Sequence, residues 1–163
     1  MSLQGRNSGY SDGVVDVSII VPACFDNPLK ESSIGFLSQV LTQRKSVVIP
    51  YSAIIGAYHI ATRYLKAPRI NVRRVLDGML RTGSPALCGE VSNKMVSDAL
   101  EYATVYDIES WDGVLVALCR SLGSSIIYSL DRELSKIREA TVVNPFSEHL
   151  VKEYHDYIQE SIG

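Results

Sequence analysis

Short apolar runs alternate with helical patterns along this chain, and that alternation limits the folds it can adopt. Runs rich in Val and Ile predict strands at residues 14–23, 46–50, 124–129 and 140–145. Helical spacing of apolar residues predicts helices at residues 31–44, 51–67, 70–83, 91–108, 111–123 and 147–161, with one or two turns at 131–137. Short apolar strands that alternate with helices predict an α/β protein whose parallel sheet is covered on both faces.

Several predicted helices carry residues typical of helix ends. Pro50 lies near the start of the helix at 51–67, and Pro68 lies just beyond its end. Ser92 is expected to cap the start of the helix at 91–108. Gly83 and Gly123 are expected to end two helices, because glycine adopts the left-handed backbone that commonly follows a last helical turn.

Length and composition indicate a single globular domain. The chain has 163 residues, of which 46% are hydrophobic and 21% are charged. We expect residues 14–163 to form the domain and residues 1–13, which contain much Gly, Ser and Asn, to form a flexible leader. A net charge of −2 excludes a protein that coats nucleic acid through bulk positive charge.

The cysteines and the apolar runs indicate a soluble, cytoplasmic protein. Cys24, Cys88 and Cys119 are scattered and include no CxxC pair, which argues against a disulfide framework and a zinc site. Buried thiols in a reducing cytoplasm are the simpler interpretation. No apolar run approaches the roughly 20 residues of a membrane span, and the N-terminus lacks the pattern of a signal peptide.

Three aspartates accompany the predicted strands. Asp16 lies within the first predicted strand, Asp112 opens the helix at 111–123, and Asp131 follows the strand at 124–129. Sites in open parallel sheets form just outside the carboxyl ends of the strands. Carboxylates that meet there repel one another, and Mg²⁺ or Mn²⁺ would relieve the repulsion. Alternatively, Asp112 stabilises a helix N-terminus and Asp131 caps a turn.

The segments VVDVSIIV, SWDGVLVALCRSLGSSIIYSLDREL and ATVVNP together resemble a PIN domain, most closely the VapC-like toxins of prokaryotic toxin–antitoxin pairs. The resemblance covers roughly residues 14–145 and lies in an ordered set of motifs, none of them specific alone. It implies a three-layer α/β/α sandwich and a metal-dependent endoribonuclease. Asp16, Asp112 and Asp131 would carry Mg²⁺ or Mn²⁺, and Ser18 and Ser129 would support these acids.

One departure from the family pattern concerns the helix at 51–67. The family carries a Glu about where Gly56 or Ala57 stands, and this helix contains no acid. His59 is a candidate nitrogen ligand nearby, although a lone His on such a helix is more often a core or rim residue. Glu133 is either a compensating acid or a solvated residue. Asp107 and Glu109 either edge the site or belong to a loop.

A basic stretch suggests an RNA-binding surface. Residues 63–81 contain one acid, Asp77, and six basic residues: Arg63, Lys66, Arg69, Arg73, Arg74 and Arg81. A solvated helix face explains the stretch equally well. The family resemblance implies a homodimer and, for a toxin, an antitoxin partner. The last helix, with Leu150, Val151, Tyr154 and Ile158 on one face, is expected to pack on the sheet or on a partner.

The sequence leaves three functional hypotheses. The first is a ribonuclease that hydrolyses RNA phosphodiester bonds with Mg²⁺ or Mn²⁺. The second is a catalytically weakened PIN domain that binds RNA or protein, which the missing Glu favours. The third is an unrelated α/β domain whose acids are helix caps.

Overall fold

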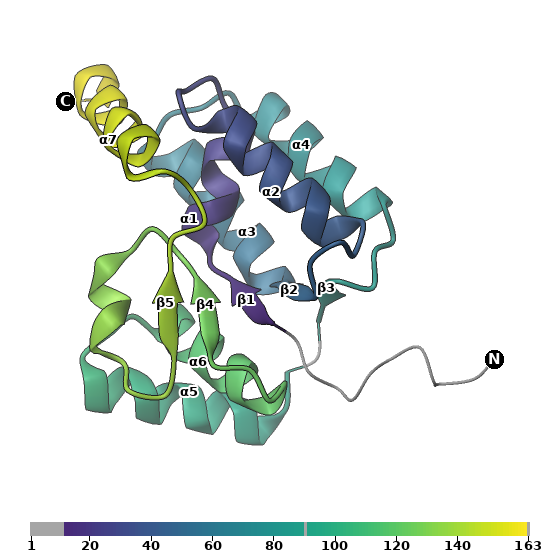
Figure 1. Ribbon diagram of the computed structural model, residues 1–163, viewed down its shortest axis with the longest axis vertical. Coiled ribbons are helices and arrows are strands. Elements are labelled where there is room, and N and C mark those ends of the chain that lie inside the picture. The colour runs from purple at the N-terminus through teal and green to yellow at the C-terminus, as the bar shows by residue number, and fades with distance from the viewer. Residues whose placement is uncertain (1–11, 90, 163) are drawn as a thin grey trace.

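The computed structural model describes residues 12–89 and 91–162. In this part of the chain the centre is a five-stranded parallel sheet with the strand order β3-β2-β1-β4-β5 (Figure 1). The strands are β1 (Gly13–Val15), β2 (Val47–Pro50), β3 (Leu87–Cys88), β4 (Ile126–Tyr128) and β5 (Thr141–Val143). Of the leader expected at residues 1–13, residues 1–11 lie outside the described residues, and Gly13 already belongs to β1.

Helices connect the strands and cover the sheet. The α-helices are α1 (Val17–Ile20), α2 (Lys30–Leu41), α3 (Tyr51–His59), α4 (Arg69–Arg81), α5 (Asn93–Tyr106), α6 (Ser110–Ser121) and α7 (Glu148–Ile162). Two 3₁₀ segments, η2 (Val21–Cys24) and η4 (Arg132–Lys136), and a π-helical segment, η3 (Ile60–Tyr64), complete the list. No helix among the described residues has the length and apolar character needed to cross a bilayer.

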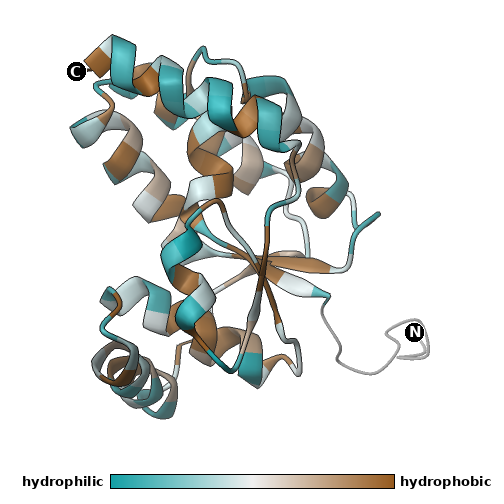
Figure 2. Ribbon diagram, turned by 60° about the vertical axis from the view of Figure 1, so that its left-hand side comes forward, coloured by the Kyte–Doolittle hydropathy of each residue, from teal (hydrophilic) through white to brown (hydrophobic). Residues whose placement is uncertain are grey.

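Alternate residues of the strands face two separate hydrophobic cores. Val14 and Ile127 pack with Val116 of α6 on one face of the sheet. Val15 and Ile49 belong to the core on the other face, which α2, α3 and α4 cover (Figure 1). Figure 2 shows hydrophobic residues concentrated on the strands between the helices. The predicted α/β class and the three-layer α/β/α sandwich are therefore confirmed.

The strand predicted over residues 14–23 is wrong beyond Val15. The chain turns at Asp16, whose backbone is extended and whose side chain accepts a hydrogen bond from the Ser18 amide, so that Asp16 caps α1. Ile19 and Ile20 are fully buried. A short, mostly buried helix can be as apolar as a buried strand, and composition alone does not separate the two. Asp16 thus lies at the carboxyl end of β1 and not inside it.

The predicted helix ends are confirmed. Gly83 and Gly123 follow α4 and α6 with φ of +60° and +70°. The Ser92 hydroxyl accepts the Met95 amide at 3.1 Å and caps α5, and Pro50 precedes α3. Strand β3 was not expected, because two residues at a sheet edge are too short to give a pattern. All three cysteines are free; Cys24 and Cys119 are buried, and Cys88 is half-buried.

Candidate functional site

A pocket of about 800 Å³ opens at the carboxyl edge of the sheet. The sheet order places β4 beside β1, and the chain leaves these two strands toward opposite sides of the sheet. Such a switch point is where open α/β sheets form ligand crevices. Six acids line the pocket: Asp16, Asp107, Glu109, Asp112, Asp131 and Glu133. The three aspartates predicted to meet therefore share one cavity.

The strand register brings Asp16 beside Ser129. Val15 pairs with Tyr128, so the next residue of each strand lies at the same level of the sheet. The Ser129 and Ser18 hydroxyls each donate to Asp16 Oδ2 at 2.7 Å. The same hydroxyls accept the amides of Asp131, at 3.0 Å, and Leu130, at 2.9 Å. Each serine thus gives its one proton to Asp16, an arrangement that suits an ionised carboxylate.

Burial opposes that ionisation. The Asp16 side chain is 4% exposed, and burial raises its pKa above the ordinary value, while the hydrogen bonds from Ser129 and Ser18 act in the opposite direction. The two serine hydrogen bonds thus favour the charged form of Asp16, and burial favours its neutral form more strongly. A positive charge nearby would be strongly favourable there.

Asp112 lies in the first turn of α6, as the helix pattern predicts. This helix leads into β4, so its start lies at the edge where β4 ends. Partial burial raises the Asp112 pKa to about 7, and the charges of Asp16, Asp131 and Glu109 add to the rise. Asp112 is therefore close enough to the other acids to be repelled by them. Its place in the first turn of α6 also fits the alternative role of stabilising the helix N-terminus.

Asp131 has a structural role as well as a place in the pocket. Its Oδ1 accepts the Glu133 amide at 2.9 Å and caps η4, which is the turn role that the sequence left open. Glu133 is exposed and lies 3.8 Å from Lys136 Nζ. Lys136 also donates to the backbone carbonyl of Asp107 at 3.0 Å. The pocket rim on this side is thus mixed in charge.

Helix α3 forms the wall where the family resemblance predicts a Glu, and the part of α3 that lines the pocket carries no acid. Gly56 lines the pocket together with Ser52, Ala53 and His59. A Cβ at Gly56 would lie 3.3 Å from Cγ2 of Val17. Gly56, where the family resemblance predicts a Glu, therefore faces the pocket, and the acids all come from other walls. His59 contacts the ring of Tyr64 and not an acid.

The acids suit a hard divalent cation in charge and donor type. All are oxygen donors, and Mg²⁺ typically uses one or two carboxylates and keeps several waters. Among the described residues, however, no group of three or more His, Cys, Asp or Glu side chains is arranged to hold a metal ion. The donor chemistry suits Mg²⁺ or Mn²⁺, but the side chains of the three aspartates are not arranged as a three-ligand group.

Sequence reasoning missed much of the pocket lining. Arg132 and Lys136 bring positive charge, and Tyr64 and Trp111 bring exposed aromatic rings. The five residues predicted to bind RNA are exposed but do not line the pocket: Arg63, Lys66, Arg69, Arg73 and Arg74. Arg132 and Lys136 belong to the short 3₁₀ segment η4. A segment of this length has no repeating apolar pattern from which the facing of its side chains could be predicted.

The last helix packs on its own domain. The predicted inner face of α7 is the less exposed one, and Tyr154 is buried, 6.4 Å from Phe25 between ring centroids. Tyr154, His155 and Ile158 line the end of the pocket. Figure 1 places α7 beside the α1 end of the molecule. The helix therefore closes one side of the cavity.

Comparison with known proteins supports the fold. The structure is similar to the crystal structure of PAE2754 from Pyrobaculum aerophilum, with a TM-score of 0.57 and 17% sequence identity over 89% of this chain and 92% of that chain. At this identity the likeness shows a shared fold alone. No protein-family model matches the sequence, and no curated protein matches it.

Proposed function

We propose that this protein is a metal-dependent endoribonuclease of the PIN type, which hydrolyses RNA phosphodiester bonds. One observation carries the proposal: Asp16, Asp112 and Asp131 come from separate segments and share one pocket, where the neighbouring charges help raise the Asp112 pKa to about 7. Ordinary helix caps do not need to converge in this way. The motif order described above supplies the reaction class.

The residues have distinct tasks in this proposal. Asp16, Asp112 and Asp131 would hold Mg²⁺ or Mn²⁺, which supplies activated water and stabilises the leaving oxygen when bound. Ser18 and Ser129 orient Asp16 and favour its ionised form. Asp112 must lose its proton to take part, which favours activity at or above neutral pH. Arg132 and Lys136 at the rim are placed to attract phosphates.

A binding role without hydrolysis is the second candidate. Gly56 occupies the wall where the family acid is expected, so one carboxylate is missing from the pocket. The remaining acids would then bind a metal weakly, and the domain would bind RNA or a protein partner. An antitoxin partner and a homodimer belong to the family resemblance, and the exposed apolar residues Val96, Leu100 and Val105 on α5 offer a surface for either.

An RNA cleavage assay tests the proposal. Purified protein is incubated with structured and single-stranded RNA in Mn²⁺, Mg²⁺ or EDTA, and the Asp112→Asn variant is assayed in parallel. Asp98→Asn is the matched control, because Asp98 is a carboxylate outside the pocket that pairs with Lys94. We expect cleavage only with metal, its loss in Asp112→Asn, and its retention in Asp98→Asn.

Two other results have clear meanings. Cleavage that persists in EDTA and in Asp112→Asn would contradict the proposal and indicate a contaminating nuclease. Well-folded protein that binds RNA but does not cut it with either metal would favour the second candidate.

A further inference from the structure

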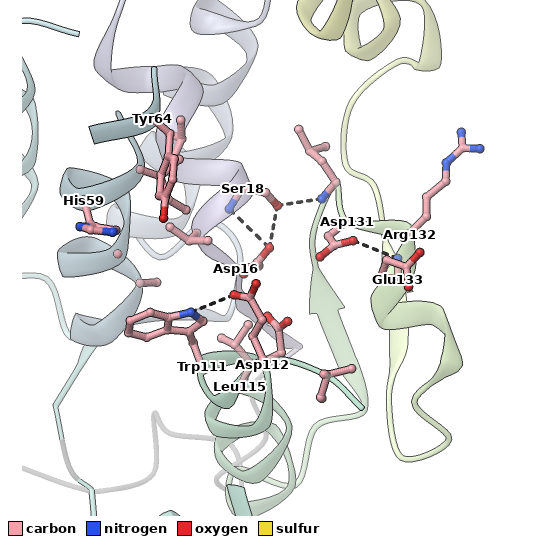
Figure 3. Close-up of a pocket in the computed structure, with 18 of the residues that line it drawn as sticks. Asp16, Ser18, His59, Tyr64, Trp111, Asp112, Leu115, Asp131, Arg132 and Glu133 are labelled. Carbon is pink, nitrogen blue, oxygen red and sulfur yellow. Dashed lines mark hydrogen bonds between the residues drawn. The ribbon is translucent and has the colours of Figure 1, made fainter. Parts of the chain in front are cut away.

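We infer that Tyr64 and Trp111 form a stacking surface for unpaired nucleobases at the rim of the acidic pocket. This inference rests on the proposed function and deepens it, because it assigns residues that hold the bases of the substrate. Both rings line the pocket, and they are 61% and 56% exposed. Figure 3 places them, with His59, on one side of the pocket and Asp131 and Glu133 on the other.

Trp111 is held in one orientation although it is exposed. Its Nε1 donates to the Glu109 carboxylate at 3.1 Å, a bond at the edge of the indole ring (Figure 3). Glu109 stands at the N-cap position of α6, yet its side chain makes no capping hydrogen bond. The carboxylate thus orients the indole and does not satisfy a helix amide. Trp111 also directly precedes Asp112, so a base on this ring lies near the acids.

The backbone around Tyr64 departs from the α-helix. In an α-helix, residues five apart point about 140° away from each other. Here Ile60–Tyr64 is π-helical, with the Leu65 amide bonded to the Ile60 carbonyl at 3.1 Å. The wider turn lets His59 and Tyr64 meet edge to face, at 5.5 Å between centroids and 84° between planes. Such turns are frequent at functional sites.

The backbone after this turn is also unusual. Lys66 has a φ of +58°, a left-handed backbone conformation that residues other than glycine rarely adopt. Residues 60–66 thus combine a π-helical turn with a left-handed residue, and the Tyr64 side chain remains largely exposed to solvent. Buried Ala61 and Ala67, joined by the Ala67 amide and the Ala61 carbonyl at 2.9 Å, stabilise this helix end, and Tyr64 stays exposed.

The surrounding charges select the ligand. Carboxylates beside aromatic rings also suit a cationic peptide, because a guanidinium binds both groups. Exposed Arg63 and Lys66 flank Tyr64, however, and Arg132 and Lys136 lie at the pocket rim. The six acids of the pocket would by themselves attract a basic peptide. With the proposed divalent cation bound among them, the surrounding cations favour a phosphate backbone instead. A single nucleic acid strand offers both parts: bases for the rings and phosphates for the cations.

The test uses Trp111 itself, since it is the one tryptophan of the sequence. Its fluorescence is measured while a short oligoadenylate is added in Ca²⁺, and binding is measured separately from cleavage. An oligonucleotide of the same length with abasic sites and an arginine-rich peptide are the comparison probes. We expect saturable quenching by oligoadenylate, and weaker binding with little quenching by the abasic strand.

Variants separate stacking from charge. We expect Tyr64→Leu to weaken oligoadenylate binding about tenfold and to leave abasic-strand binding unchanged. Tyr157→Leu is the matched control, because Tyr157 is a 38%-exposed tyrosine on α7 that does not line the pocket. Circular dichroism checks that both variants fold. Equal loss for both probes, or no loss in Tyr64→Leu, would overturn the inference.

The remaining outcomes are also decisive. Tighter binding and stronger quenching by the arginine-rich peptide would overturn the inference in favour of a cationic protein ligand. Base-dependent quenching without RNA cleavage would support the stacking surface and reject the hydrolysis proposed above. If cleavage depends on metal, is unchanged in Tyr64→Leu and comes without base-dependent quenching, the hydrolysis proposed above would be supported and the stacking surface rejected.

Discussion

Asp112 is a residue whose charge depends on pH in the neutral range. Its pKa is raised from 3.8 to about 7 by partial burial and by the neighbouring acids. Between these pH values the folded chain keeps a proton that the unfolded chain has already lost. Asp112 therefore makes the fold less stable as the pH rises through this range. A bound divalent cation would remove that penalty, because it favours the ionised form.

Replacement of Asp112 by Asn tests this dependence without a metal. In EDTA we expect Asp112→Asn to be more stable than the wild type by roughly 1–2 kcal/mol at pH 8, after allowance for solvent screening. Near pH 4 the two proteins should differ little, because Asp112 is then protonated in the folded chain. Urea unfolding at both pH values measures the difference. A gap that is the same at pH 4 and pH 8 would contradict the raised pKa.

Ser129 ties two strands together through its hydroxyl. It donates to Asp16 Oδ2 and accepts the Asp131 amide, so Ser129→Ala leaves both groups without that partner. We expect this variant to lose about 1–3 kcal/mol of unfolding free energy in urea. Ser135→Ala is the control, because Ser135 is exposed, and its effect should stay within about 0.5 kcal/mol. Equal effects of the two variants would show that the network contributes nothing.

At the scale of elements, α5 and α6 depend on a close approach at Gly113. A Cβ there would collide with the backbone carbonyl of Ala99, which cannot move like a side chain. We expect Gly113→Ala to cost about 1–3 kcal/mol of stability in thermal unfolding. Gly78→Ala on α4 is the matched control, since a Cβ there has no atom within 4 Å. That variant should gain about 0.5–1 kcal/mol, and a similar loss in both would contradict the account.

The elements also show how far local patterns reach. Gly83, Ser92 and Gly123 ended or began helices as predicted, because cap chemistry depends on a few adjacent residues. The strand predicted at residues 14–23 runs past the true end of β1, because α1 has the apolar composition of a strand. The π-helical turn at Ile60–Tyr64 leaves no period in the sequence. Its role in the placement of Tyr64 was therefore beyond prediction.

At the scale of the whole molecule, topology accounts for the part of the site that was predictable. Asp16, Asp112 and Asp131 each adjoin the carboxyl end of β1 or β4, and the parallel order of the sheet makes these ends adjacent. Sequence order and the rule for open sheets were enough to expect this. Tyr154 of α7 reaches the pocket only through the long return of the chain, which no local pattern specifies.

Thermal unfolding with and without Mn²⁺ tests whether the shared acid pocket binds a divalent cation, as we propose. At a Mn²⁺ concentration about 100 times its Kd, the wild type should gain about 2.7 kcal/mol, which corresponds to a rise in Tm of about 5–10 °C. Asp98→Asn should respond in the same way, because Asp98 lies outside the pocket. Asp112→Asn should lose most of the response. An equal Mn²⁺ response in Asp112→Asn and the wild type, or none in the wild type at millimolar Mn²⁺, would contradict the account.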